Sequence, residues 1–383
     1  MALHFAREEF ADRQRRAIRL MAEGGLDGLL MFRQESMYYL TGYDTFGFVF
    51  FQCLYLGADG TLILLTRAPD LRQAQHTSTI ADIRIWVDGE EAKPAEDLRR
   101  ILEEQRCRGK RLGVEWEAYG LTARNGRRLA QALEGFATLE DASDLVSRLR
   151  LVKSPAEIAY VRDAARLADR AWDEALGLTR PGVDEAEILA AMQGAVFRGG
   201  GDYPANEFII GSGRDALLCR YFSGRRQLAA EDQLTLEFAG AYRHYHSCLM
   251  RTIRIGPKLP RQQDMHAACK DALLACEAAL KPGTPVGAVF EAHVGVLDRA
   301  GYKAHRLNAC GYSLGALFAP NWMDWPMLYR GNPVIAAPGM VFFIHMIIMD
   351  SESGVAMTLG RTSLVTEGGA EPLSRAGIDY VSI

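Results

Sequence analysis

Hydrophobic and polar positions in the first 150 residues alternate between helical and strand-like spacing. Residues 8–24 repeat their apolar side chains every three to four positions, as a helix does, and the apolar run 28–32 is typical of a buried strand. Further short strands and one helical segment are predicted at 61–65, 83–87, 94–105 and 111–115. This order predicts a small α/β domain with a mixed sheet.

A change of pattern near residue 150 predicts a domain boundary. Ser154 and Glu157 have the spacing of a capping box, and Pro155 suits the first helical position, where its missing N–H is not needed. We expect a long helix to begin there. It would separate an N-terminal domain (1–150) from a second, larger domain (151–383).

Beyond the boundary, the same succession of elements is predicted twice. Helices near 156–178 and 185–199 precede one group of strands, and helices near 262–280 and 285–300 precede another. The strands are expected at 207–211, 233–239, 245–255, 304–307, 340–349 and 355–365. Two helices followed by an antiparallel hairpin, repeated, predict a curved sheet with helices on one face and a cleft between the halves.

Composition and charge exclude several classes of protein. The 383 residues include 44 basic and 48 acidic side chains without a basic block, which argues against nucleic acid or an anionic membrane as partner. Seven cysteines at irregular spacing predict reduced thiols rather than disulfides or a structural zinc site. The longest apolar run, 340–349, is too short to span a membrane, and the first residues lack the apolar core of a signal peptide. We therefore expect a soluble, cytoplasmic protein.

Two of the predicted strands carry a motif that resembles a known family. The stretch 236–252 resembles the two-aspartate strand pair of the pita-bread family, which contains aminopeptidase P, prolidase, methionine aminopeptidase and creatinase. In metal-dependent members both aspartates bind metal ions, but here Glu237 and Cys248 stand in their places. The resemblance covers roughly residues 150–370. It implies an α+β fold, with a pita-bread catalytic domain behind a smaller α/β N-terminal domain.

The other ligand positions of that family have changed as well. Tyr312 stands where the family has a ligand histidine, and His345 and Gly360 stand where it has glutamates. One carboxylate among five positions cannot hold two divalent ions. The resemblance therefore implies catalysis without metal or cofactor, for which creatinase is the precedent. A single metal ion held by Glu237, Cys248 and His345 is the alternative.

Glu237 and His345 are the candidate catalytic residues. Glu237 lies inside an apolar strand, where an isolated carboxylate is costly to bury as an anion, so it needs a cationic ligand or partner. A buried pair with Arg251 is the structural alternative. His345 alone would be interpreted as a core histidine, but its coincidence with a family ligand position favours a role in the site. His244 and His246, near the turn of the predicted hairpin, are expected at the surface.

A set of further side chains is predicted to bind substrate. Arg220 stands where related enzymes have a histidine, and its guanidinium offers a fork of donors that suits a carboxylate; a solvated surface position is the alternative. Aromatic faces attract delocalised organic cations. The other predicted substrate-binding residues are Cys219, Tyr312, Trp322, Trp325, Phe46 and Phe48. In creatinase-like dimers the N-terminal domain of one subunit covers the other's active site, so the resemblance implies a homodimer in which Phe46 and Phe48 act in trans.

These residue types together predict a small zwitterionic substrate. A delocalised cation would suit Glu237, a carboxylate would suit Arg220, and the central carbon of an amidinium is electrophilic enough to be hydrolysed without a metal. Segments 34–47, 70–77 and 305–315 are similar to those of the ectoine hydrolases, a group related to creatinase. That resemblance implies hydrolysis of the cyclic amidine of ectoine to an N-acetylated diaminobutyrate.

The catalytic roles implied by this resemblance leave one choice open. Glu237 would either attack the amidinium carbon directly or activate water against it, and His345 would transfer the proton to the departing nitrogen. Two other functions remain compatible with the residues. One is a creatinase-like hydrolase of another amidine or guanidine, and the other is a non-catalytic binding protein related to Xaa-Pro peptidases.

Overall fold

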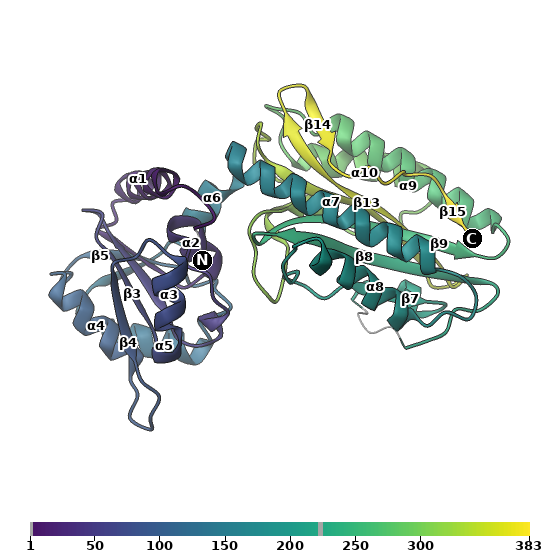
Figure 1. Ribbon diagram of the computed structural model, residues 1–383. Helices are drawn as coiled ribbons and strands as arrows, with labels where there is room; N and C mark the ends of the chain where they lie inside the picture. The colour runs from purple at the N-terminus through teal and green to yellow at the C-terminus, as the bar shows by residue number, and fades with distance from the viewer. Residues whose placement is uncertain (1–2, 221–224) are drawn as a thin grey trace. The chain divides into compact units, whose positions relative to one another are not determined.

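The computed structural model describes residues 3–220 and 225–383, which divide into two compact units, Met1–Arg150 and Leu151–Ile383 (Figure 1). The N-terminal unit contains a six-stranded sheet in the order β4-β3-β2-β1-β5-β6. Strand β1 (Gly28–Met31) pairs antiparallel with β2 (Cys53–Gly57) and parallel with β5 (Arg111–Val114), so the sheet is mixed, in agreement with the pattern of the sequence. The other elements of this unit are α1 (Arg7–Glu23), α2 (Gln34–Thr41), β3 (Leu62–Arg67), α3 (Leu71–Thr77), β4 (Asp82–Trp86), α4 (Pro94–Glu104), α5 (Ala123–Leu133), β6 (Thr138–Asp141) and α6 (Leu145–Leu151).

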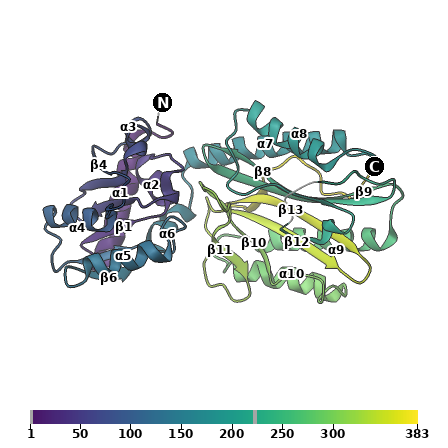
Figure 2. The same cartoon turned by 90° about the horizontal axis from the view of Figure 1, so that it is seen from below.

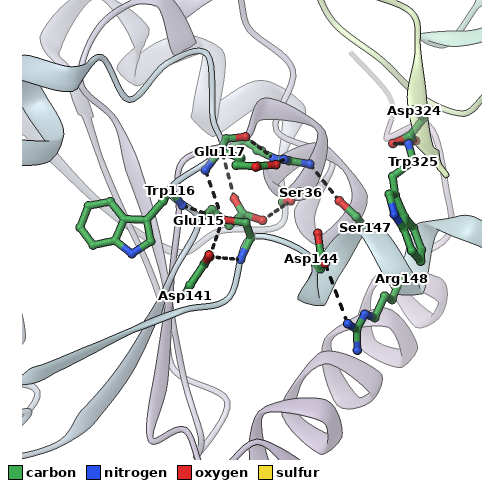
Figure 3. A network of polar contacts seen from close by, with 12 residues as sticks. Ser36, Glu115, Trp116, Glu117, Asp141, Asp144, Ser147, Arg148, Asp324 and Trp325 are labelled. Carbon is green, nitrogen blue, oxygen red and sulfur yellow. Dashed lines mark hydrogen bonds and ion pairs between the residues drawn. The ribbon is translucent and has the colours of Figure 1, made fainter. Parts of the chain in front are cut away.

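A buried carboxylate at the end of β5 fixes the start of α2 (Figure 3). Glu115 accepts hydrogen bonds from the backbone N–H groups of Phe32 and Arg33, at 3.0 and 2.9 Å, and from the Ser36 hydroxyl at 2.5 Å. These donors lie at the N-terminal end of a helix, where backbone N–H groups have no partner within the helix. Burial raises the pKa of Glu115 to about 7, although the same hydrogen bonds oppose that shift.

The C-terminal unit begins with the helix that the capping box predicts. Helix α7 (Pro155–Leu178) has the Ser154 side chain accepting the Glu157 N–H, while the Glu157 carboxylate accepts the Ser154 N–H at 2.9 Å, so the prediction is confirmed. Glu157 also accepts the Tyr245 hydroxyl at 2.7 Å. The first turn of α7 is thereby fastened to the start of β9 (Tyr245–Ile255).

The sheet of this unit has a repeated arrangement. Its strand order is β11-β10-β12-β13-β9-β8-β7, with β9 and β13 at the centre. Outward from the centre lie β8 and β7 on one side and β12, β10 and β11 on the other. Three strands of each half therefore correspond and follow two helices in the chain, and the second half adds the edge strand β11. The elements are α8 (Glu185–Arg198), β7 (Ile209–Ser212), β8 (Asp232–Tyr242), α9 (Pro260–Ala279), α10 (Gly287–Arg299), β10 (Ala309–Ser313), β11 (Asp324–Tyr329), β12 (Val341–Asp350), β13 (Val355–Thr366), β14 (Gly369–Pro372) and β15 (Val381–Ser382).

The helices of this unit cover one face of the sheet, as the sequence predicted. Phe238 on β8 stacks against Trp172 of α7, with ring centroids 6.5 Å apart. Ile344 on β12 belongs to the hydrophobic core that α9 and α10 bury. The register connects these two residues in one row across the sheet, through Leu249 and Arg361, so they lie on the same face. Figure 2 shows α7 and α8 along the β8 side and α9 and α10 along the β12 side.

Several strands differ from the prediction, since β6, β14 and β15 were not expected. Residues 304–307, expected as a strand, contain a turn and an isolated bridge at Arg306, and the strand β10 begins at Ala309. The edge strand β11 was not predicted. None of the helices over the described ranges 3–220 and 225–383 is long and apolar enough to cross a membrane.

Candidate active site

One row of paired residues crosses the centre of the sheet and joins the two candidate catalytic residues. Glu237 on β8 lies opposite Met250 on β9, and Met250 lies opposite Gly360 on β13. Gly360 in turn lies opposite His345 on β12. Because paired residues on neighbouring strands share a face, Glu237 and His345 point to the same side of the sheet, which is the side away from the helices.

Tyr312 on β10 shows that the sheet curves around this face. It pairs with Phe343 on β12, two residues from His345, and therefore shares the face of His345. Its hydroxyl donates to Glu237 Oε1 at 3.1 Å, and its ring lies 5.7 Å from the His345 ring. Strands β10 and β8 are four positions apart in the sheet, or roughly 19 Å if it were flat. The contact therefore requires a sheet whose two halves face each other.

Trp322 extends this group by one hydrogen bond. Its indole N–H donates to the Tyr312 hydroxyl at 2.9 Å. Both side chains are buried, with exposed fractions of 1% for Trp322 and 4% for Tyr312. Trp322 thus donates to Tyr312, and Tyr312 donates to Glu237, so that a chain of two hydrogen bonds ends at the carboxylate.

The environment of Glu237 combines burial with two favourable contacts. Burial raises its pKa to about 7, while the Tyr312 hydrogen bond and the positive charge of Arg220 oppose the shift. Arg220 itself is exposed to solvent. Burial and the negative charge of Glu237 raise the pKa of both neighbouring thiols, Cys219 and Cys248. Glu237 is therefore the acidic centre of a group of neutral side chains, with one cation at its edge.

Arg251 does not pair with Glu237, so the structural alternative for that carboxylate is wrong. The Arg251 guanidinium donates to the backbone carbonyls of Met250, Gly360 and Gly377, at 2.8, 2.5 and 3.1 Å. It also lies 5.9 Å from the Trp172 ring of α7. These contacts place it on the helix face of the sheet, away from the carboxylate.

Burial lowers the pKa of His345 to about 3, and its electrostatic interactions with His293 and Arg220 act in the same direction, so the imidazole is neutral near pH 7. Its Nδ1 atom is buried and has no hydrogen-bond partner in the part of the chain that the structure describes. The rings of Tyr312 and Phe343 flank it, at 5.7 and 5.3 Å. A buried nitrogen without a partner costs about 1 to 3 kcal/mol, which a ligand or a water molecule can recover.

The donor atoms on this face do not fit the metal pair of the pita-bread enzymes. Within residues 3–220 and 225–383, no group of three or more histidine, cysteine, aspartate or glutamate side chains could hold a metal ion. A Cβ atom at Gly360 would meet His345 Cβ at 2.9 Å and the Phe343 ring at 3.0 Å. Aromatic packing therefore fills the space that a ligand side chain at residue 360 would need.

The remaining predicted substrate-binding residues are Trp325 in this unit and Phe46 and Phe48 in the N-terminal unit. Trp325, on β11, packs half-buried against the core beneath α9 and α10. In the N-terminal unit, Phe46 is 77% exposed, whereas Phe48 is buried. The role in trans stays a prediction, and only Phe46 presents an open ring.

Two features of this region were not predicted. His246 was expected at the surface but is fully buried, and its Nε2 atom accepts the Ala205 N–H at 2.9 Å. Burial lowers the pKa of His246 to about 4. The hydrogen bond between Trp322 and Tyr312 is the second feature. The alternation of β9 could have located His246, because it shares the face of Cys248.

Comparison with known proteins places the chain in a family. Residues 159–367 match the model of metallopeptidase family M24, and residues 13–152 match the creatinase/prolidase N-terminal domain. The chain belongs to metallopeptidase family M24. Among curated relatives, an ectoine hydrolase from Halomonas elongata is 27% identical, over 98% of this chain and 97% of that protein. A Xaa-Pro dipeptidase from Pyrococcus furiosus is 22% identical, over 95% of this chain and 98% of that protein.

Solved structures of similar proteins confirm the fold. A prolidase from Thermococcus sibiricus superposes with a TM-score of 0.87 at 20% identity, covering 98% of this chain and 99% of that one. Dipeptidase PepE from Mycobacterium ulcerans gives a TM-score of 0.85 at 25% identity, covering 99% of each chain. The pita-bread fold predicted from the strand motifs is therefore confirmed. Since one fold hosts many reactions, the activity has to be argued from the side chains of the site.

Proposed function

We propose that the chain is a hydrolase that opens the cyclic amidine ring of ectoine to N-acetyl-diaminobutyrate without a metal ion. The observation that carries the proposal is Glu237, a buried carboxylate that faces a tyrosine hydroxyl instead of a metal site or a paired arginine. The similarity to an ectoine hydrolase over 98% of the chain supports the choice of substrate.

The charges of ectoine match those of the site. An amidinium cation placed against Glu237 would restore the electrostatic energy that the carboxylate loses on burial, and it would return the pKa of Glu237 toward its ordinary range. The ring of Tyr312 adds an aromatic face for a delocalised cation. The substrate carboxylate would bind Arg220, because the fork of donors on a guanidinium suits a carboxylate. Arg220 is exposed, and it acts on Glu237 through its charge rather than through a direct hydrogen bond.

The reaction needs one water molecule and two proton transfers. The water oxygen adds to the amidinium carbon, and one C–N bond of the tetrahedral adduct then breaks. The oxygen becomes the amide carbonyl, and both protons of the water end on the departing nitrogen, which leaves as an ammonium group. A carboxylate with a pKa of about 7 suits the first transfer, because it accepts a proton and returns it near neutral pH.

His345 suits the second transfer because it starts neutral. A neutral imidazole has a free lone pair that accepts the proton of the adduct hydroxyl, and the resulting imidazolium passes this proton to the departing nitrogen. The low pKa of His345 makes the imidazolium a strong donor. Tyr312 contacts both Glu237 and His345 and would hold them on either side of the reacting carbon.

Direct attack by Glu237 gives the same product through a mixed anhydride between the Glu237 carboxyl group and the imidic acid of the opened ring. If water then hydrolyses this anhydride at the Glu237 carboxyl carbon, a Glu237 oxygen stays in the product amide, so a single turnover in water enriched in ¹⁸O labels Glu237 and leaves the amide unlabelled. Addition of water to the substrate labels the amide instead, and mass spectrometry of the product and of the peptide that contains Glu237 measures both outcomes. We expect the label in the amide only, because a neutral His345 has no spare proton for the departing nitrogen before water adds.

A substrate panel tests the proposed activity. Purified protein would be assayed with ectoine, hydroxyectoine, creatine and a Xaa-Pro dipeptide, each with and without chelator. We expect turnover of ectoine that chelator does not reduce. Turnover of creatine alone would favour the guanidine hydrolase, chelator-sensitive cleavage of the dipeptide would indicate a peptidase, and binding of ectoine without turnover would indicate a binding protein.

A further inference from the structure

The hydrogen bond between Trp322 and Tyr312 has a fixed direction. An indole N–H can only donate, so the Tyr312 oxygen is the acceptor in this contact, at 2.9 Å. The Tyr312 hydroxyl has one proton, and its other hydrogen-bond partner among residues 3–220 and 225–383 is Glu237 Oε1 at 3.1 Å. That proton is therefore directed at the carboxylate.

We propose that Trp322 is a positioning residue that acts through Tyr312. Its indole N–H occupies the acceptor side of the Tyr312 hydroxyl, so the hydroxyl can only donate to Glu237. A hydroxyl that donates in this direction favours the ionised carboxylate. A hydroxyl without this indole could instead rotate and accept a proton from a neutral glutamic acid. The indole removes that possibility. Hydrogen bonds in such a chain also polarise one another, so the donor at its end becomes stronger.

The contact leaves the second carboxylate oxygen for the substrate. Tyr312 binds Oε1, and the proposed function assigns the other oxygen to water or to the amidinium. Burial keeps solvent from competing, since Trp322 is 1% exposed and Tyr312 4%. The inference rests on the proposed function for its effect on turnover, but the direction of the hydrogen bonds can be measured without any substrate.

Other charged and titratable groups that face Glu237 could also change its pKa. Among the described residues they are Arg220 and Cys219 in the segment after β7, Cys248 on β9, Tyr312 on β10 and, next to Tyr312, His345 on β12. Trp322 has no charge, so it can affect Glu237 only through the hydroxyl or through packing. A test must separate these two effects.

The first test follows the indole N–H of Trp322 by ¹H–¹⁵N NMR while the pH is changed. The chain has five tryptophans, so five indole signals are expected, and the one missing from Trp322→Phe identifies residue 322. In the wild-type protein this signal should titrate with a midpoint near that of Glu237. The response should disappear in both Tyr312→Phe and Glu237→Gln, because each breaks the chain. A Trp322 signal that still titrates in Tyr312→Phe, or that never titrates in the wild type, would overturn the proposal.

The second test is a double-mutant cycle that uses ¹³C NMR of glutamate side chains to follow Glu237. We expect Trp322→Phe to raise the Glu237 midpoint by about half a unit, and Tyr312→Phe by about one unit or more. Trp322→Phe should add nothing in the Tyr312→Phe background. A packing effect would instead persist in that background and contradict the proposal. Trp172→Phe is the matched control, because Trp172 packs on the opposite face of β8 and should leave the midpoint unchanged.

Kinetics complete the experiment with the active enzyme. With ectoine as substrate, Trp322→Phe should lower kcat/KM about threefold below the midpoint and much less at high pH, as a half-unit shift requires. Failure of the proposed function would show itself as absence of turnover in the wild type. The two NMR titrations would still decide the role of Trp322 in that case.

Discussion

Gly360 lies directly opposite His345 on the neighbouring strand, and a Cβ atom on Gly360 would come within 2.9 Å of His345 Cβ. The same atom would lie 3.0 Å from both the Ile344 carbonyl oxygen and the Phe343 ring. Backbone cannot give way as a flexible side chain can. The packing around residue 360 therefore leaves no room for a ligand side chain, and we expect that restoring this one residue would not restore a metal centre.

Gly360→Glu should consequently destabilise the protein without creating metal affinity. We expect the free energy of unfolding to fall by about 1 to 3 kcal/mol, as overpacking of a core does. Urea denaturation measures the loss. Gly177→Ala is the control, because Gly177 lies in α7 with open space around it, and alanine there should be neutral or stabilising by about 0.4 to 1 kcal/mol. Unchanged stability in Gly360→Glu would show that the strand can open to admit a side chain.

Activity should be independent of divalent metal. The described residues offer one carboxylate and no set of three ligands at the site, so we expect no stoichiometric transition metal in the purified protein and full turnover in the presence of chelator. Elemental analysis and assays with and without chelator measure this. One metal ion per subunit together with turnover that chelator abolishes would contradict the prediction.

Glu237→Gln should abolish turnover and at the same time stabilise the protein at alkaline pH. The amide keeps the shape but can neither accept a proton nor balance a cation. Because burial raises the pKa of Glu237 from its ordinary 4.5 to about 7, the folded state holds the proton more tightly than the unfolded chain between these pH values. Stability is therefore lost as pH rises from about 4.5 through 7. The variant should be more stable than the wild type at pH 8, by at most about 3 kcal/mol, and the difference should vanish near pH 4.

Thermal or urea denaturation across this pH range measures the difference. Glu352→Gln, at an exposed turn between β12 and β13, is the control and should change neither activity nor the pH dependence of stability. Glu115 in the N-terminal unit is a second glutamate whose pKa burial raises to about 7. A substitution there tests the pH dependence of stability independently of the site. A Glu237→Gln variant with near-normal turnover would remove this residue from the mechanism.

The pH profile of kcat/KM should show one acidic limb near pH 7. Glu237 must be ionised to accept a proton, so activity rises with pH through its pKa. His345 is neutral above about pH 3 and adds no limb between pH 5 and 8. Assays from pH 5 to 9 at low substrate concentration measure the profile. A bell-shaped curve with a second limb below pH 8 would point to a charged histidine in the free enzyme.

Arg220→Gln should weaken substrate binding more than it slows the chemical step. Removing the guanidinium removes the partner of the substrate carboxylate and also one of the charges that lower the pKa of Glu237. We expect KM to rise by about 10 to 100-fold, as loss of a charge-assisted contact implies. Arg214→Gln is the control, since Arg214 is an exposed arginine of the same segment. Equal effects of both substitutions would indicate a general change of surface charge.

Phe46→Ala should raise KM if the protein is a two-fold dimer whose N-terminal domain covers the partner's site, as we propose. Phe46 presents an open aromatic face, which suits a delocalised cation. Analytical ultracentrifugation measures the oligomeric state and steady-state kinetics the effect on KM. Tyr119→Ala, at another exposed aromatic residue of the same unit, should leave KM unchanged. A fully active monomer would contradict the proposal.

Local signals in the sequence predicted most of the fold, and the exceptions have identifiable causes. The capping box at Ser154 and the alternation around Glu237 depend only on neighbouring residues, and both are found as expected. Strand β10 was not recognised because it lacks the β-branched side chains typical of strands. It contains Gly311 instead, which packs against the neighbouring backbone. Strand β11 was not predicted because it contains Pro326, and a proline in a sequence argues against a strand. The structure tolerates this proline because β11 lies at the edge of the sheet.

The site was harder to predict than the fold because its contacts depend on the curvature of the sheet. Residues 312 and 237 are far apart in sequence and four strands apart in the sheet, so their hydrogen bond cannot be inferred from spacing. Trp322 and Trp325 belong to one short segment, but only Trp322 reaches Tyr312. The family positions identified Glu237 and His345, whereas the polar chain that links Trp322 to Glu237 required the structure.

The repeated arrangement of the strands bears on which bond of the substrate breaks. Strands β8 and β12 occupy equivalent places in the two halves of the sheet, yet one carries an acid and the other a neutral imidazole. Two identical halves would accept a cyclic amidine in either orientation and release a mixture of two isomers. Here the anionic half and the imidazole half are chemically distinct, and Arg220 comes from the segment between β7 and β8, in the half that carries Glu237. In the proposed reaction the ring is therefore held one way round, and a single acetylated regioisomer is formed.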